Sequence, residues 1–118
     1  MFLHDRKHGR TTRVSTSSGA VEGNGAAHER PSISAAGDFV VFASSASNLV
    51  PADGNGVSDV FVHDVLGGRT ERASVGSHGG EADGPSRTPV ISGNGRLVAF
   101  VSDATNLTPG DANHCADA

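Results

Sequence analysis

Two runs of consecutive hydrophobic residues, 39–42 (FVVF) and 97–101 (LVAFV), stand out along the chain. A strand that is apolar at successive positions is covered on both faces, whereas a strand of a two-sheet sandwich alternates more cleanly. Shorter segments at 32–34, 60–64 and about 70–75, separated by Gly and Asn, complete a pattern of four short strands. No segment has the spacing of an amphipathic helix, so the sequence predicts an all-β fold with essentially no helix.

This strand pattern occurs twice, because most of the chain aligns with itself at an offset of 58 or 59 residues. Internal repeats of this length indicate an array of similar structural units. Four-stranded antiparallel sheets that are covered on both faces by their neighbours are the blades of a β-propeller, which is the predicted architecture. The matching segments are 2–5 with 61–64, 9–15 with 68–74, 30–34 with 88–92, 38–44 with 96–102 and 47–49 with 105–107.

Turn residues separate the predicted strands. Asn94-Gly95 predicts a two-residue hairpin with both residues at positive φ, and the counterpart Ala36-Gly37 predicts a less favourable turn, because Ala resists that conformation. Asp64 and Asp5, at equivalent strand ends, are expected to cap the hairpins that follow them.

The motif Pro-Ser-Ile-Ser, then Gly-Asp-Phe-Val-Val-Phe, Asn-Leu-Val-Pro and Asp-Val-Phe-Val-His-Asp resembles the TolB-like β-propeller repeats (WD-repeat-like) of bacterial, often secreted, proteins. The family usually has Asp before the hairpin Gly, where this chain has Ala36 and Asn94. The resemblance implies two blade equivalents arranged as half blade, full blade and half blade. Residues 1–15 would be strands three and four of one blade, 31–75 a complete blade, and 89–102 strands one and two of a third.

Such an arrangement leaves an apolar sheet face at each end, which favours association. Two explanations stay open: the chain is a piece of a longer propeller, or the terminal half-blades of several copies pair and close a ring. From His114 onward the repeat decays, with only Asp117 in register.

Composition excludes several function classes. The net charge of −4 and the absence of a basic groove argue against nucleic-acid binding. A single cysteine, Cys115, excludes an internal disulfide framework and a CxxC zinc site. No apolar run approaches the roughly 20 residues of a membrane span, and charges follow Met1 where a signal peptide has its apolar core, so a soluble chain is expected. The resemblance suggests a bacterial extracellular or periplasmic location.

One acidic, Gly-rich loop invites a metal interpretation. Asp53, Asn55 and Asp59 offer oxygen atoms at positions 1, 3 and 7, the first half of a calcium loop, although the distal Glu of an EF-hand is lacking. The alternative is an Asx-turn loop whose side chains bond their own backbone. Calcium is therefore one of two open interpretations. The same spacing recurs at Asp111, Asn113 and Asp117.

Catalytic signals are weak. His63-Asp64 and His4-Asp5 stand at equivalent strand ends, which indicates architecture rather than acid–base chemistry. No Gly-x-Ser-x-Gly elbow is present. The charges that recur on the fourth strands are expected to protect outer edges. They are Arg10, Arg13, Arg69 and Arg72.

The sequence therefore predicts a non-catalytic β-propeller repeat module, acting as a scaffold or as a protein- or glycan-binding surface, with calcium as its possible stabilising ion. The alternative is the propeller portion of a larger enzyme, such as a prolyl oligopeptidase-like hydrolase. A third interpretation is a repeat fragment with no independent function.

Overall fold

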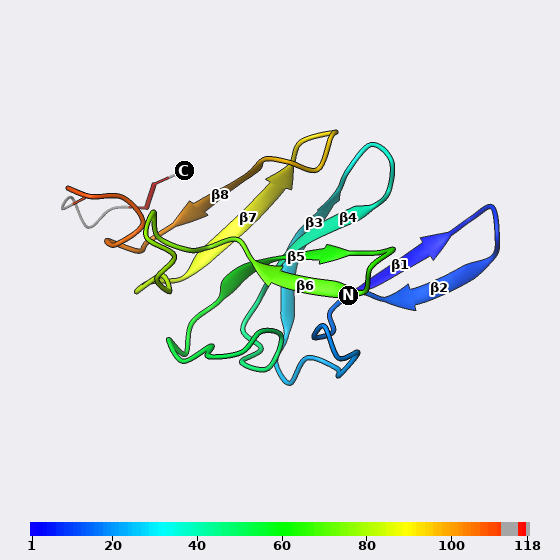
Figure 1. Cartoon of the computed structure of the whole chain (residues 1–118), viewed down its shortest axis with the longest axis horizontal. Helices are drawn as coiled ribbons and strands as arrows, with labels where there is room; N and C mark the ends of the chain where they lie inside the picture. Colours follow the sequence, from blue (N-terminus) through cyan, green and yellow to red (C-terminus); the bar gives the residue numbers. More distant parts are fainter. Residues whose placement is uncertain (112–115, 118) are drawn as a thin grey trace.

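The computed structural model describes residues 1–111 and 116–117, which form eight β-strands joined by turns and loops (Figure 1). All pairings between the strands are antiparallel, and the described residues contain no helix, so the all-β, antiparallel prediction is confirmed. None of them could therefore cross a bilayer as a helix. The strands are β1 (Phe2–Asp5), β2 (Arg10–Arg13), β3 (Ala27–Ile33), β4 (Phe39–Ser44), β5 (Asp59–Asp64), β6 (Arg69–Arg72), β7 (Ser86–Ile91) and β8 (Val98–Ser102).

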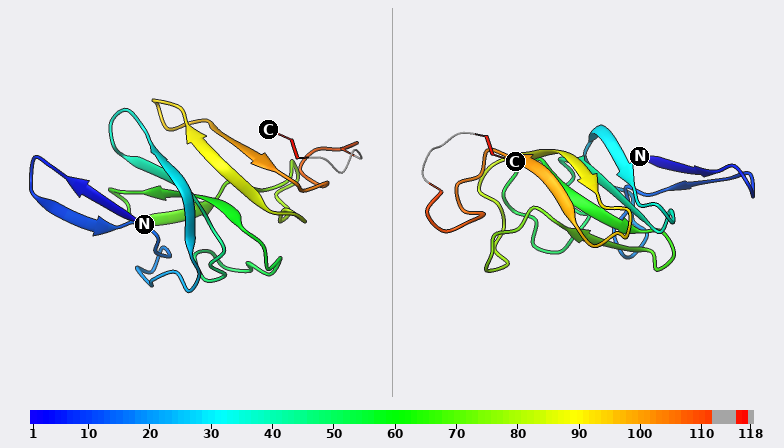
Figure 2. Two further views of the ribbon diagram at one scale, coloured as in Figure 1. Left: turned by 180° about the vertical axis from the view of Figure 1, so that it is seen from behind. Right: turned by 90° about the horizontal axis from the view of Figure 1, so that it is seen from above.

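The strands group into three sheets: β1-β2, then β3-β4-β5-β6, then β7-β8. The four-stranded sheet lies in the middle, and the two hairpins lie toward opposite ends of the long axis of a 48 × 28 × 22 Å molecule (Figures 1 and 2). The sheets do not close into a ring, so the propeller arrangement and the assignment of blades stay predictions.

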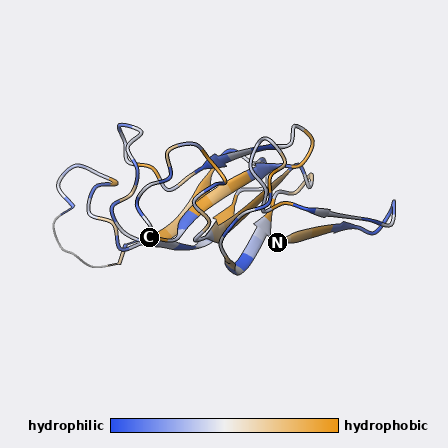
Figure 3. Ribbon diagram, turned by 90° about the horizontal axis from the view of Figure 1, so that it is seen from below, coloured by the Kyte–Doolittle hydropathy of each residue, from blue (hydrophilic) through white to orange (hydrophobic). Residues whose placement is uncertain are grey.

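Strand β4 is covered on both faces, as its continuous apolar run predicts. On one face Phe42 packs with Phe61 of β5, with ring centroids 5.9 Å apart, and both side chains are fully buried. On the other face Val41 and Val60 belong to a second cluster, against which residues of β7 and β8 pack. The hydropathy colouring in Figure 3 shows the same concentration of apolar residues in the strands of the middle.

The equivalent run on β8 is covered less completely. Phe100 is only partly buried, Ala99 is exposed, and Leu97, just before the strand, is 72% exposed. The prediction of burial on both faces is therefore wrong for this second run. The physical reason is that only one face of β8, with Val98 and Phe100, packs on the middle sheet, whereas no described strand covers the opposite face, on which Ala99 lies.

The repeat is visible in the hydrogen bonds between loops. The Asn48 amide nitrogen donates to the Glu22 carbonyl oxygen at 2.8 Å, and the Asn106 amide nitrogen donates to the Glu81 carbonyl oxygen at the same distance. Each of these asparagines lies in the loop after the second strand of its sheet, and its hydrogen bond joins that loop to the loop before the first strand. The two units are therefore alike in their connections as well as in their strands.

One detail of the turns differs from the prediction, and another agrees with it. Only the glycine of each turn is left-handed, with φ of 77° at Gly37 and 74° at Gly95, whereas Ala36 and Asn94 are not. Ala36 therefore carries no backbone penalty, and the reason given for a weaker turn is wrong. The capping prediction is confirmed: Asp64 Oδ1 accepts from the backbone N–H groups of Leu66 and Gly67, and Asp5 makes the equivalent contacts.

Candidate functional site

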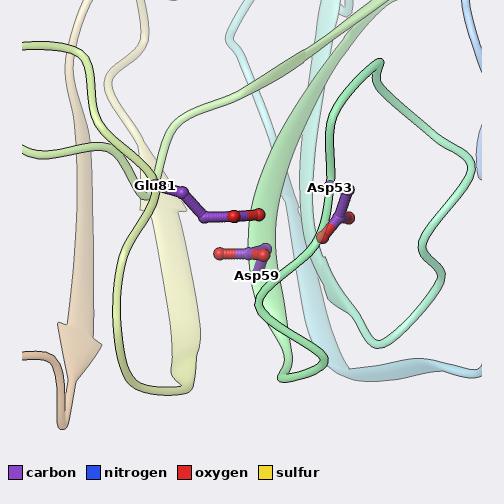
Figure 4. A group of neighbouring side chains, drawn as sticks. All are labelled: Asp53, Asp59 and Glu81. Atoms are coloured by element: carbon purple, nitrogen blue, oxygen red, sulfur yellow. The ribbon is translucent and has the colours of Figure 1, made fainter.

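Three carboxylate side chains converge at the N-terminal end of β5. Asp53 comes from the loop before β5, Asp59 is its first residue, and Glu81 lies in the loop between β6 and β7. One oxygen atom from each lies within 4.8 Å of the others, and Figure 4 shows the three side chains pointing toward one another. A group of this kind could hold a metal ion, since carboxylate oxygens are the preferred ligands of hard cations.

A guanidinium group already lies against these carboxylates. Arg72, the last residue of β6, places Nη1 2.5 Å from Glu81 Oε1 and 3.5 Å from both Asp53 Oδ1 and Asp59 Oδ2. Its side chain is only 11% exposed, and its Nε atom is buried with no hydrogen-bond partner in the part of the chain that the structure describes. One cation therefore faces three carboxylates, which we call the acidic cluster, and two formal negative charges remain without a counter-charge among the described residues.

Asp59 is the most completely enclosed member. Its side chain is fully buried, and its Oδ1 atom accepts from the Ser74 hydroxyl at 2.6 Å. Its Oδ2 atom accepts from the Asn55 amide nitrogen at 2.9 Å. Hydrogen bonds to a buried carboxylate offset the cost of removing its charge from water.

Asn55 faces the acidic cluster as a donor. While its amide nitrogen bonds Asp59 and the Ala82 carbonyl, its Oδ1 atom accepts from the Val57 backbone N–H at 3.1 Å. This is the Asx-turn geometry of the second sequence interpretation. Asp53 and Asp59 are thus brought together as the metal interpretation requires, but Asn55 presents its amide nitrogen, not its oxygen, to them.

The charges within the cluster shift its titration. Burial, together with the nearby carboxylate of Asp59, raises the pKa of Asp53, despite the opposing effect of Arg72. The pKa of Glu81 is lowered, chiefly because its carboxylate accepts a hydrogen bond from the Gly54 backbone N–H. The negative charge of Asp53 is therefore disfavoured, whereas that of Glu81 is favoured.

The second predicted loop is only partly described. Asn113 lies outside the described residues. Asp117 is in register, because its backbone pairs with Ser102 as Asp59 pairs with Ser44. Asp111 is described as well, but neither it nor Asp117 joins a metal-type group within residues 1–111 and 116–117.

Sequence reasoning missed two members of the cluster. Glu81 was not singled out, and Arg72 was expected to protect an outer edge, which is wrong, because its side chain is nearly buried between the carboxylates. Both residues had a signal in the repeat: Arg13 and Glu22 stand 59 positions earlier and form an ion pair of their own.

The two repeated histidines make the same local contact. His63, which is 4% exposed, has Nδ1 2.9 Å from the Thr70 hydroxyl, and His4 has Nδ1 2.7 Å from the Thr11 hydroxyl. Burial lowers the pKa of His63. Each contact joins the two strands of a hairpin, which is a structural role available at both positions.

Comparison of the chain with models of protein families, with curated proteins and with solved structures finds no match in any of the three. The resemblance to TolB-like repeats therefore stays a prediction that rests on the residues quoted for it.

Proposed function

We propose that this chain is a non-catalytic repeat module of the β-propeller type, which serves as a scaffold or as a binding surface for a protein or glycan. The observation that carries the proposal is that polar residues recur in matched structural contacts. The hydrogen bonds of Asn48 and Asn106 and the histidine contacts of both units are examples. Side chains that hold strands and loops in place at every repeat are engaged in architecture, and specificity on such a frame lies in the loops.

The binding surface is the rim formed by the long loops. Residues 14–26, 45–58 and 73–85 connect strands at one end of the sheets, whereas tight hairpins close the other end (Figure 1). Side-chain hydrogen bonds between loops hold this rim in place, such as those from Asn24 to Ser47 and from Thr105 to Asp83. Exposed polar groups on a rigid frame suit recognition of another polar surface.

The proposal is tested by binding and turnover measurements on the intact chain. We expect a glycan array or a displayed peptide library to yield ligands whose affinity falls when exposed rim residues such as His78 are replaced by Ala. Replacing Lys7, on a tight hairpin at the opposite end, is the control and should leave affinity unchanged. Turnover of ester, glycoside or peptide substrates that is lost in His63→Gln, while the variant stays folded, would contradict the non-catalytic assignment.

A second candidate function is calcium binding at the acidic cluster. It is favoured by the two uncompensated negative charges and by the raised pKa of Asp53, which a divalent cation would reverse. Arg72 competes for the same oxygen atoms, so the ion would have to displace its guanidinium group from Glu81.

Thermal unfolding with added calcium decides this candidate. Binding to the folded state alone raises the melting temperature as calcium increases, and Asp53→Asn should reduce that rise. Magnesium, which requires stricter octahedral geometry, is the control ion. If saturating calcium leaves the melting temperature unchanged, the metal role is abandoned and the scaffold proposal is unaffected.

A further inference from the structure

Strands β1 and β8, toward opposite ends of the molecule, each have an edge that is largely unpaired, although the equivalent edges in the central sheet pair with each other. In that sheet β4 and β5 pair over six residues, from Phe39↔Asp64 to Ser44↔Asp59. By the repeat, β8 corresponds to β4 and β1 corresponds to β5. Among the described residues, however, β1 pairs with β2 alone, and the outer edge of β8 is bridged only at Ser102.

A groove runs along the exposed side of β8. Its volume is about 1090 Å³, and its lining comes from β8, from the loop after β6, from residues 107–111 and from Asp117. Val75, Phe100 and Leu107 provide apolar walls, and Asp111 and Asp117 stand in its lining as well. A groove that is lined by apolar side chains and by two aspartates is suited to an apolar strand that carries a positive charge.

The central sheet shows which side chain fills the equivalent space. There Phe61 of β5 packs against Phe42 and is fully buried. Phe100 takes the place of Phe42 in the second unit, and Phe2 of β1 takes the place of Phe61 in the first. Phe2, near the N-terminus, is 63% exposed, so an aromatic ring that could pack beside Phe100 is present on the surface of a second copy.

The charged residues that correspond to the acidic cluster are divided between the two ends of the chain in the same way. In the centre Arg72 contacts the aspartates before and at the start of β5, together with Glu81. In the first unit Arg13 forms the equivalent ion pair with Glu22, but its side chain is 35% exposed, and no described aspartate takes the places of Asp53 and Asp59 beside it. The residues at those repeat positions, Asp111 and Asp117, follow β8, which lies toward the opposite end of the long axis from the β1-β2 hairpin (Figure 1).

We propose that copies of this chain associate head to tail, with β1 of one copy added to the outer edge of β8 of the next. The product is a four-stranded antiparallel sheet, β7-β8-β1-β2, made from two chains, and the inference rests on the propeller-type repeat of the proposed function. The register of β4 and β5 pairs Phe100 with Phe2 and Ala99 with Leu3 across the junction. It also brings Arg13 and Glu22 of one copy to Asp111 and Asp117 of the other.

This contact joins two different surfaces, so it closes a ring only if successive rotations add up to a full turn. Each chain contributes two blade equivalents, and propellers close with about 4–8 blades. We therefore expect a discrete assembly of about two to four chains. An open series of the same contacts would give a concentration-dependent ladder of masses instead, with the same junction in each member.

The first test is the solution mass of the chain and of two single variants by light scattering and sedimentation. Phe2→Asp is expected to give a monomer of 11.9 kDa, with a dissociation constant raised by at least about 30-fold, as for loss of a central aromatic anchor. Leu66→Asp is the matched control: it replaces an 82% exposed apolar residue outside the junction and should leave the mass unchanged. Because Phe2 is itself exposed, its replacement should also leave the fold intact.

The second test separates head-to-tail pairing from non-specific association. The double variant Asp111→Arg/Asp117→Arg disrupts the contact surface beside β8 and leaves that of β1 intact. Phe2→Asp disrupts the contact surface of β1 and leaves that beside β8 intact. Each variant alone should be monomeric, and an equimolar mixture should form a complex of two chains and no larger species. Only a heterologous contact gives this complementation.

A monomeric wild-type chain at micromolar to submillimolar concentration overturns the proposal. Association that survives both Phe2→Asp and the aspartate double variant overturns it as well. Neither result bears on ligand binding by the loop rim, which can be measured on the monomeric variants. Failure of this inference and failure of the proposed function are therefore distinguishable.

Discussion

Removal of the Arg72 guanidinium group tests the physical account of the acidic cluster most directly. Arg72→Met keeps an apolar stem of similar length and deletes the only positive charge that contacts Asp53, Asp59 and Glu81 in the described structure. The three carboxylates then face one another with 4%, 0% and 27% of their side chains exposed. We expect the variant to fold but to lose much of its stability at neutral pH.

The magnitude follows from the burial of the group. Breaking a buried ion pair by removing one partner costs about 3–5 kcal/mol, because an uncompensated charge is left behind. Glu81 is partly in contact with water and can turn outward, so the lower end, about 3 kcal/mol, applies here. For a domain of this size, that loss lowers the melting temperature by about 12 °C.

The assay is urea and thermal unfolding of the variant beside a matched control. Arg69→Met removes the neighbouring Arg69–Glu71 pair, whose side chains are 70% and 66% exposed, and should cost less than about 1 kcal/mol. The difference between the two variants should shrink as the pH falls, because a protonated carboxyl group needs no cation, and Asp53, whose pKa is raised, loses its charge before Glu81, whose pKa is lowered. Equal losses for Arg72→Met and Arg69→Met at pH 7 would refute the argument.

Three further predictions concern the backbone and a buried histidine. Ala52 has φ of 58° where its repeat counterpart is Gly110, so Ala52→Gly should raise the unfolding free energy by about 0.5–1 kcal/mol. A Cβ at Gly84 would lie 2.8 Å from a backbone nitrogen, so Gly84→Ala should cost about 1–3 kcal/mol in urea unfolding, and Gly80→Ala, in open space, much less. The lowered pKa of His63 means that stability falls as pH drops below about 6.5, and His63→Gln should flatten that slope.

The parts of the fold that could be predicted from sequence are those set by local pattern. The buried strand β4 and its partner β5 follow from runs of Val and Phe bounded by turn residues. The start of β3 at Ala27, rather than at 32, could not be predicted in this way. Residues 28–31 are polar or Pro, and the strand passes through them with an irregularity between His28 and Ser32. Pairing with β4, not local preference, extends it.

The acidic cluster shows a different limit. Asp53 and Asp59 were found because they are close in sequence within one Gly-rich loop, but Arg72 and Glu81 reach them from another strand and another loop. A short sequence motif does not show which cation will lie beside its carboxylates. Here that cation is the guanidinium group of Arg72. The repeat could have identified Arg72 together with Glu81, since Arg13 and Glu22 stand at the same spacing in the sequence and also form an ion pair.

The repeat also explains why equivalent residues differ so much in exposure. Phe61 and Phe2 occupy the same place in their units, yet one is fully buried and the other is 63% exposed. Their local sequences are alike, so the difference comes from their neighbours: Phe61 has Phe42 of β4 beside it and packs in one cluster with Val14 and Leu49. The exposed Phe2 on β1 and the groove beside β8 therefore correspond to two surfaces that pack on each other between β5 and β4 in the central sheet. If the junction forms, Arg13 and Phe2 should become as protected as Arg72 and Phe61, and hydrogen exchange at β1 should slow with increasing protein concentration.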